Sequence, residues 1–361
     1  MVRVTTQGPD APCALSVRGL TIIRKFGRDR RLVLEDISLS AQPGEITAIL
    51  GAPCAGKTSL LAAIAGLLKV ERGAVLVGGT DVTAARPARR GIGFLPPGAM
   101  LDPDRPLGST LGPSRGRDHA RPQAILAALG LPADLMPGGA THGQGFAALT
   151  AARLLADETV LLVDEAGTGL DWAARDAMLA WLRAEAGRGR AILLATRHAE
   201  TALAADHLVL LQDGRVLQAG TPASVYTEPR DQAAALLTGS ANILRGTLRQ
   251  KTPGTLVWVA EGHRFVQADM PGQPPPALGC AVMVCLRPAR VTLWSPALPN
   301  RLPAQIAALT CRGDHTVLCC DTPLGTLQAY CDTPSALRAG MAVDLGWTSQ
   351  AATVLTGGLP S

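Results

Sequence analysis

The feature that most constrains the fold is a glycine-rich segment between an apolar run and helix-like text. Residues 51–58 read GAPCAGKT and fit the pattern G-x-x-x-x-G-K-[ST]. The apolar run at residues 45–50 precedes it, and a helix is expected to begin at Lys57. In such a strand–loop–helix, the backbone N–H groups of the loop and the helix N-terminus surround phosphate groups. The pattern predicts a phosphate-binding site in an α/β domain, in preference to a chance glycine-rich loop.

Two parts of the sequence are expected to share the chemistry of this site. Lys57 is expected to reach the β- and γ-phosphates, and the Thr58 hydroxyl to coordinate Mg²⁺. Residues 160–165 read VLLVDE, an apolar strand that ends in two carboxylates. Asp164 is expected to hold Mg²⁺ through water, and Glu165 to polarise the attacking water. Taken alone, the two acids would indicate a solvated strand end; beside the phosphate loop, the catalytic interpretation is favoured.

Composition sets the size and excludes several classes. The chain has 361 residues, 47% apolar and 17% charged, which predicts two domains with packed cores. A net charge of +5 with 3% aromatic residues argues against a nucleic-acid-binding surface. There is no apolar window of about 18 residues and no secretory signal pattern, so a cytoplasmic location is expected. The eight cysteines form no C-x-x-C pair, which argues against a zinc site, and the six after residue 279 are expected to be buried small hydrophobes.

The pattern of the sequence changes near residue 238. Before it, short apolar strands alternate with helical segments, which indicates an α/β layout. The expected strands are residues 45–50, 159–163, 191–196 and 207–211, and the expected helices include residues 57–68 and 172–185. After it, runs rich in Val, Leu and Thr are separated by Gly and Pro, which indicates a small β-barrel or sandwich. These runs include residues 256–260, 281–286, 316–320 and 342–347.

With these motifs in place, nearly the whole chain resembles the ATP-binding subunits of ABC transporters. Phe26 lies where that family has an aromatic residue that stacks on adenine, although a core or edge phenylalanine is an equal alternative. Asp171, in the run 168–171, resembles the family's D-loop, and residues 213–222 resemble its strand–turn–strand text. The resemblance implies the following cofactor-binding residues: Phe26, Gly51, Ala52, Pro53, Cys54, Ala55, Gly56, Lys57, Thr58, Ser59 and Asp164.

The C-terminal text resembles the OB-type regulatory domain of importers of the sulfate, ferric iron, polyamine and maltose type. The resemblance rests on residues 239–247, 286–288, Trp347 and 352–355. It implies an α/β P-loop ATPase domain, with a mixed sheet flanked by helices, at residues 1–238. A helical insertion is expected at about 97–150, and a small all-β OB-like domain at 239–361. An interaction and dimer-stabilising role is expected for this second domain.

The motif that the family presents to a partner subunit's ATP is altered in this chain. That signature reads Leu-Ser-Gly-Gly-Gln in the family, and the matching stretch here is residues 141–145, THGQG. His142 replaces the serine, Gly143 is retained, and Gln144 replaces the second glycine, where a side chain impedes close approach of the backbone to phosphate. Residues 136–140 are a less favoured alternative.

Three further positions depart from the family pattern. Pro97 stands where the family has a glutamine that couples the site to the membrane subunit. Arg197 occupies the usual position of the switch histidine, and His198 follows one residue later; we expect His198 to serve if the loop shifts. Cys54 replaces a glycine of the phosphate loop, which requires a φ angle that suits a β-carbon.

The sequence therefore predicts an ATP-binding, ATP-hydrolysing subunit that uses Mg²⁺ and energises solute import through partner membrane permeases. It is expected at the inner face of the cell membrane, with a periplasmic solute-binding protein as an indirect partner. The altered signature predicts slow turnover as a homodimer, or pairing with a second ATPase subunit. The alternative is a catalytically weak nucleotide-binding regulatory or scaffold subunit; a DNA-repair ATPase and a small-molecule kinase are less favoured.

Overall fold

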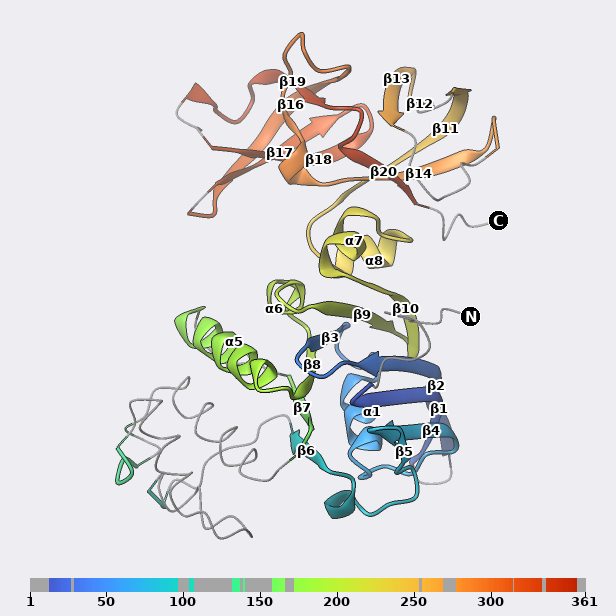
Figure 1. The fold of residues 1–361 in the computed structure, drawn as a ribbon. Helices are drawn as coiled ribbons and strands as arrows, with labels where there is room; N and C mark the ends of the chain where they lie inside the picture. Colours follow the sequence, from blue (N-terminus) through green and yellow to red (C-terminus); the bar gives the residue numbers. More distant parts are fainter. Residues whose placement is uncertain are drawn as a thin grey trace. The chain divides into compact units, whose positions relative to one another are not determined.

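The computed structural model describes residues 13–26, 29–96, 104–106, 132–136, 139, 158–165, 172–252, 255–268, 277–313, 315–332 and 336–355. The chain divides into two compact units, Met1–Ala223 and Ser224–Ser361 (Figure 1). The division assigns helix α8 (Gln232–Leu237) to the second unit. The expected domain boundary after residue 238 stays a prediction, and most of the expected insertion at 97–150 lies outside the described residues.

A six-stranded sheet forms the centre of the first unit, in the order β10-β9-β3-β8-β7-β6 (Figure 1). Strands β9, β3, β8, β7 and β6 pair in parallel, and β10 is antiparallel to β9. Every residue of β3, β7 and β8 is buried, as expected for central parallel strands. The strands are β3 Ile46–Leu50, β6 Ile92–Leu95, β7 Val160–Asp164, β8 Ala191–Thr196, β9 His207–Gln212 and β10 Arg215–Gly220.

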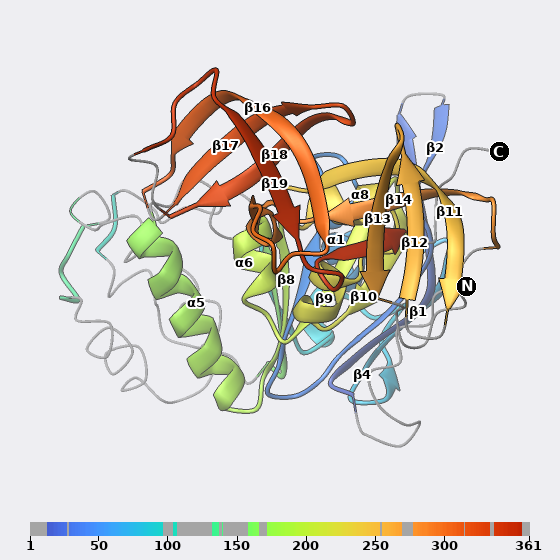
Figure 2. The ribbon, with the colours of Figure 1, turned by 90° about the horizontal axis from the view of Figure 1, so that it is seen from above.

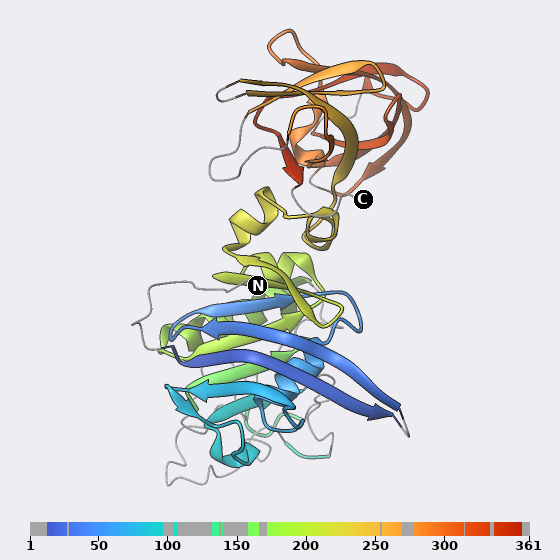
Figure 3. The ribbon, with the colours of Figure 1, turned by 90° about the vertical axis from the view of Figure 1, so that its right-hand side faces the viewer.

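An antiparallel sheet in the order β2-β1-β4-β5 completes the first unit, and its blue strands lie in front in Figure 3. Its long hairpin, β1 (Leu15–Phe26) and β2 (Asp29–Ala41), contributes apolar side chains to the same core as helix α1 (Lys57–Ile64) and the central sheet. One hydrophobic core therefore holds the hairpin against α1. The remaining elements are β4 Arg72–Val77, β5 Thr80–Asp81, a 3₁₀ turn Pro87–Arg89, α5 Trp172–Gly187 and α6 Ala199–Leu203.

A buried arginine anchors the C-terminal end of α1. The Arg90 guanidinium donates hydrogen bonds to the carbonyl oxygens of Ala63 (3.1 Å) and Ile64 (2.8 Å). A cation is favourable at this position because the last carbonyls of a helix carry partial negative charge. α1 ends at Ile64, earlier than the expected residue 68, because Gly66 adopts a left-handed φ of 83° beside this guanidinium.

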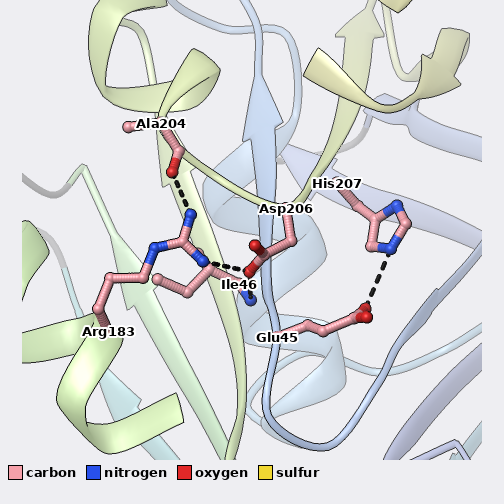
Figure 4. Close-up of polar contacts among 6 residues, drawn as sticks. All are labelled: Glu45, Ile46, Arg183, Ala204, Asp206 and His207. Carbon is pink, nitrogen blue, oxygen red and sulfur yellow. Dashed lines mark hydrogen bonds and ion pairs between the residues drawn. The ribbon is translucent and has the colours of Figure 1, made fainter. Parts of the chain in front are cut away.

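A polar network fixes the N-terminal end of β3, where the strand begins at Ile46 (Figure 4). The Asp206 carboxylate accepts a hydrogen bond from the Ile46 backbone N–H (2.8 Å) and pairs with Arg183 of α5. Arg183 also donates to the Ala204 carbonyl oxygen, and His207 Nε2 lies 3.0 Å from a Glu45 carboxylate oxygen. These contacts join the starts of β3 and β9 to α5.

The second unit contains two five-stranded antiparallel sheets, β13-β12-β11-β14-β20 and β15-β19-β16-β17-β18. The long, curled strands β16 to β19 are visible in Figure 2. Trp258, Phe265 and Trp347 pack at the centre of the core, with ring centroids 4.5 and 5.2 Å apart. The elements are α7 Pro222–Thr227, α8 Gln232–Leu237, β11 Asn242–Thr252, β12 Thr255–Ala260, β13 His263–Ala268, β14 Ala281–Leu286, a 3₁₀ turn Pro288–Arg290, β15 Thr292–Leu293, β16 Asn300–Cys311, β17 Thr316–Thr322, β18 Gly325–Cys331, β19 Ala342–Trp347 and β20 Ala352–Leu355.

Two buried asparagines connect the sheets of the second unit. Asn300 accepts from the Val266 N–H (2.7 Å) and donates to the Val266 carbonyl oxygen (2.9 Å). Asn242 makes the same pair of bonds with the backbone of Gln328, both at 2.8 Å. Because a buried amide left without partners is costly, these pairs fix the register of one sheet against the other.

The arginine of the Leu-Arg-Pro motif at residues 286–288 also has a structural explanation. Arg287 is buried and donates to the carbonyl oxygens of Ala235 (2.8 Å) and Tyr226 (2.9 Å) and to the Thr238 hydroxyl (2.8 Å). Its guanidinium also lies over the Tyr226 ring, 4.1 Å from the centroid. It therefore holds α8 and the end of α7 against strand β14.

Candidate functional site

A cavity of about 740 Å³ opens beside the phosphate loop of the first unit. This volume is in the range typical of small-molecule sites. Its walls come from the β1–β2 hairpin, the loop with the start of α1, the end of β7, and the β9–β10 turn. The lining residues are Arg24, Arg31, Leu32, Val33, Pro53, Cys54, Gly56, Lys57, Thr58, Ser59, Glu165, Asp213 and Gly214.

The conformation of the phosphate loop requires glycine at two of its positions. A β-carbon at Gly51 would lie 2.4 Å from the Leu211 carbonyl oxygen. Gly56 precedes α1 with φ 105°, where a β-carbon would lie 2.6 Å from Leu34 Cδ2. Cys54 is exposed and has φ 65°, a left-handed conformation that disfavours a β-carbon. The replacement of the expected glycine by Cys54 therefore places strain in this loop.

Lys57 is the first residue of α1 and is 4% exposed. Its ammonium donates to the carbonyl oxygens of Gly51 (2.9 Å) and Ala52 (3.1 Å). It also lies 3.2 Å from a carboxylate oxygen of Glu165. The loop thus holds the lysine charge at the wall of the cavity, next to one of the two acids that end β7.

Asp164 is the last residue of β7 and is 4% exposed. Neither of its oxygens meets a donor at full hydrogen-bond geometry within the described part of the chain. Burial raises the pKa of Asp164, and the Glu165 carboxylate adds to this, while the Thr58 hydroxyl and Lys57 lower it. A buried carboxylate and a neighbouring hydroxyl are hard oxygen donors of the kind that Mg²⁺ prefers, so these residues fit the predicted metal.

Glu165 and His198 lie at the ends of neighbouring strands. Glu165 has φ 51°, a strained conformation for a residue with a side chain, and lines the cavity. His198 is half-buried after β8, and its N–H donates to the Thr196 hydroxyl (3.1 Å). Burial lowers the pKa of His198, aided by Arg175 and Arg197 and opposed by Glu165. Its imidazole is therefore neutral at neutral pH, and Arg197 beside it is exposed.

The β9–β10 turn links the phosphate loop to the hairpin. The Gly214 N–H donates to the Ala55 carbonyl oxygen (3.1 Å), and the Gly214 carbonyl accepts from the Glu35 N–H (2.9 Å). A β-carbon at Gly214 would lie 2.2 Å from the Val33 carbonyl oxygen, so only glycine fits. The Asp-Gly-Arg text at 213–215 thus has a definite place in the site, beyond its likeness to a family motif.

The structure brings most of the expected site residues together. Of the expected site residues, the following line the cavity: Pro53, Cys54, Gly56, Lys57, Thr58, Ser59 and Glu165. Gly51, Ala52, Ala55, Asp164 and His198 are not among the lining residues. The Phe26 backbone pairs with Asp29 at the end of the hairpin. Asp171, Pro97 and the signature-like His142, Gly143 and Gln144 lie outside the described residues. The sequence analysis missed six lining residues: Arg24, Arg31, Leu32, Val33, Asp213 and Gly214. Two signals could have indicated some of them, namely the basic run RKFGRDRR at residues 24–31 and the glycine of the β9–β10 turn.

Comparison with known proteins places this geometry in a family. The ABC transporter profile matches residues 34–168, and the TOBE domain profile matches 284–355. The chain is 31% identical to an Fe(3+) ions import ATP-binding protein of Streptomyces coelicolor, over 97% of this chain and 99% of that one. The chain belongs to the ABC transporter ATP-binding subunits. The ABC subunit is also 31% identical to a sulfate/thiosulfate import ATP-binding protein of Chromobacterium violaceum, over 84% of its own length and 83% of that protein's.

Solved structures agree with this assignment. The ABC subunit matches an ATP-binding subunit of an ABC transporter with a TM-score of 0.50 and 26% identity, over 59% of this chain and 91% of the other. A dimeric ATP-binding cassette bound to ADP and Pi, at TM-score 0.51 and 21% identity, shares the fold. The predicted family, the ATP hydrolase class and the α/β-plus-OB architecture are therefore confirmed. Among the described residues of this ABC subunit, no helix is both long and apolar enough to cross a membrane.

Proposed function

We propose that this ABC subunit binds and hydrolyses MgATP in the cavity at the start of α1 and so energises solute import. The observation that carries the proposal is the arrangement of Lys57 and Asp164. A buried ammonium is held at the cavity wall by two loop carbonyls and Glu165. The buried Asp164 carboxylate finds no hydrogen-bond partner in the part of the chain that the structure describes. Burying these charged groups costs free energy, and proteins keep such an arrangement where a bound polyanion and its metal cation complete the site. Two relatives, matched over 97% and 84% of this chain, carry the name import ATP-binding protein.

The residues of the chain divide the work of ATP hydrolysis. The loop N–H groups and the N-terminus of α1 receive the phosphates, and Lys57 moves from Glu165 to the β- and γ-phosphate oxygens. This movement frees the Glu165 carboxylate to orient water and accept its proton. His198 follows β8 and is not among the cavity-lining residues, so its imidazole would donate to the γ-phosphate only if this loop shifts. Mg²⁺, held by Thr58 and Asp164, would neutralise charge that develops on the phosphate oxygens.

The subunit works in a dimer attached to permeases at the inner face of the cell membrane. In a homodimer both sites would receive the altered signature around His142 and Gln144, so we propose slow turnover by the isolated chain. Pairing with a second ATPase subunit that has an unaltered signature would leave Glu165 at one fully active site. Steady-state ATPase activity of the purified chain, alone and with its permeases, tests this. Turnover by the isolated homodimer equal to that of an unaltered importer subunit would contradict the slow-turnover proposal.

The role of the pocket is tested by a Lys57→Ala substitution. Loss of the ammonium removes its contacts with both terminal phosphates, and we expect ATP affinity to fall about 100-fold or more. Isothermal titration calorimetry on the full chain measures this, with Lys69→Ala, outside the cavity lining, as the control. An unchanged ATP affinity in Lys57→Ala would refute the proposed site.

A further inference from the structure

Two walls of the nucleotide cavity belong to different sheets of the first unit. The phosphate loop follows β3 of the central sheet, whereas the hairpin wall belongs to the antiparallel sheet that contains β1 and β2. The two walls meet closely at Gly56, where a β-carbon would lie 2.6 Å from Leu34 Cδ2. A ligand that fills the cavity contacts both walls, so its affinity depends on what fixes one wall against the other.

A tight turn between β9 and β10 joins these two walls. Its residues, Asp213 and Gly214, have φ of 47° and 74°, as in the Asp-Gly turns that connect neighbouring antiparallel strands. The Gly214 N–H donates to the Ala55 carbonyl oxygen of the phosphate loop (3.1 Å). The Gly214 carbonyl oxygen accepts from the Glu35 N–H of β2 (2.9 Å). One residue of the turn is therefore hydrogen-bonded to the backbone of both walls.

A side-chain pair strengthens the same junction. Arg215 directly follows the turn, and its Nε and Nη2 donate to Glu35 Oε2 at 3.1 and 2.6 Å. The two side chains are 67% and 42% exposed, and neither residue lines the cavity. The guanidinium presents its donors in a rigid fork, so a pair of this kind restricts orientation as well as distance. The pair thus fixes the hairpin to the turn from outside the cavity.

We propose that Arg215 and Glu35 are positioning residues for the nucleotide. Without touching the ligand, the pair holds the hairpin wall and the phosphate loop at the spacing that ATP requires. This inference rests on the proposed function and adds to it the residues that set the width of the cavity. Lys57 and Glu165 are positioned by α1, the loop carbonyls and the end of β7, which do not include this pair. Loss of the pair therefore weakens ATP binding and leaves the hydrolytic step intact.

Titration calorimetry with MgATP and steady-state ATPase kinetics on the full chain test the inference. We expect Glu35→Gln and Arg215→Gln each to weaken ATP affinity about two- to fivefold, the range of an exposed ion pair. KM should rise as far, with kcat unchanged. The reversed pair Glu35→Arg/Arg215→Glu should restore most of the affinity, because it keeps the backbone bonds of Gly214.

The signs of the two effects separate positioning from a simple effect of charge near the cavity. Glu35→Gln removes a negative charge and Arg215→Gln a positive one, so a long-range charge effect on ATP would have opposite signs in the two variants. Arg30→Gln is the matched control, because Arg30 lies on the same strand, forms an exposed pair with Glu71 (3.2 Å) and does not line the cavity. In about 1 M salt the wild type and the two glutamine variants should converge in affinity, because exposed charges are then screened.

The remaining outcomes would overturn the inference in distinguishable ways. Wild-type ATP affinity in both glutamine variants, even with a lower thermal transition, would show that the pair only stabilises the fold, and would leave the proposed function intact. Opposite signs in the two variants, an equal loss in Arg30→Gln, or no recovery in the reversed pair would also overturn the positioning role. Wild-type chain that does not bind MgATP would overturn the proposed function and this inference together.

Discussion

The two ends of strand β3 have opposite character. At its start, the Ile46 N–H and Arg183 satisfy the Asp206 carboxylate, and Glu45 lies beside His207. At its other end, the loop between β3 and α1 carries Cys54 in a left-handed conformation. The neighbouring β7 ends at the buried Asp164, whose oxygens find no hydrogen-bond partner among the described residues, and the strained Glu165 follows it. One end of the strand is arranged for stability and the other for binding a ligand.

The difference indicates where this fold stores unfavourable energy. Strained backbone and unsatisfied buried groups persist only where the surrounding structure holds them in place, and they concentrate at functional sites. The network at Asp206 and the Arg90 contacts at the end of α1 hold the strand and helix on either side of the loop. Substitutions at the two ends of β3 should therefore affect activity and stability in opposite ways.

The largest effect is expected from Glu165→Gln. The amide keeps the shape of the side chain but cannot accept a proton from water, and loss of a general base typically lowers rate 10²- to 10⁴-fold. ATP affinity should stay the same or rise, because Lys57 no longer pairs with a carboxylate in the empty site. Single-turnover ATPase assays and calorimetry measure the two quantities. Wild-type turnover by this variant would remove Glu165 from the proposed mechanism.

Asp206→Asn is expected to weaken the stable end. Loss of the charge-assisted bonds to Ile46 and Arg183 should lower the free energy of unfolding by about 1–3 kcal/mol and leave ATP affinity unchanged. Denaturant unfolding measures the first quantity. Arg30→Gln serves as the control, since its exposed pair with Glu71 should contribute little. A fall in ATP affinity with unchanged stability would contradict the assigned structural role.

The pH dependence of stability provides a second test of Asp206. Burial raises the pKa of Asp206, but Arg183 and the Ile46 N–H outweigh it and hold the value below its ordinary 3.8. A carboxyl group with a lowered pKa in the folded state stabilises the protein above its unfolded pKa. This contribution is lost as the pH falls through the folded value. Below about pH 4, the wild type and Asp206→Asn should therefore converge in stability.

Much of this fold is predictable from sequence because its signals are local. The central strands are continuous apolar runs, and the G-x-x-x-x-G-K-T loop between the first strand and α1 fixes the α/β arrangement. The ends of β8 and β14 also agree with the expected residues 191–196 and 281–286. The residue assignments of the site remain predictions, and the position of Lys57, Thr58 and Glu165 on the wall of one cavity supports them.

The parts that sequence reasoning missed depend on non-local pairing. Arg24 pairs with Arg31 only after three register shifts in the β1–β2 ladder. The alternation of apolar and polar residues in the sequence does not reveal such shifts. Lys57 meets Glu165 because α1 and β7 are brought together by the core, although the two residues are far apart in sequence. The need for glycine at position 214 likewise comes from Val33, on another strand. These contacts follow from tertiary packing rather than from local propensity.

In the ligand-free protein, Asp164→Asn should raise the free energy of unfolding, whereas Asp206→Asn should lower it. Burial raises the pKa of Asp164, so charging this carboxyl costs stability as the pH rises through its folded-state value. The amide removes that cost, and we expect a gain of about 1 kcal/mol at neutral pH, together with loss of Mg²⁺-dependent hydrolysis. Thermal unfolding with and without MgATP measures both. A loss of stability without ligand would show that Asp164 has partners that satisfy it.

The smallest expected effect is that of Cys54→Gly, which tests whether the strain lies in the loop itself. At φ 65° a residue with a β-carbon costs about 1–2 kcal/mol relative to glycine, and glycine's greater freedom in the unfolded chain offsets part of this. We therefore expect a net gain of up to about 1 kcal/mol in denaturant unfolding. Cys311→Gly, at an exposed cysteine outside the cavity, is the control and should not stabilise the protein. Because the loop keeps its N–H groups, ATP affinity should be retained.

If Cys54→Gly instead destabilised the chain, the cysteine side chain would have to make a contact that outweighs the strain. The contrast between the two ends of β3 would then rest on Asp164 and Glu165 alone.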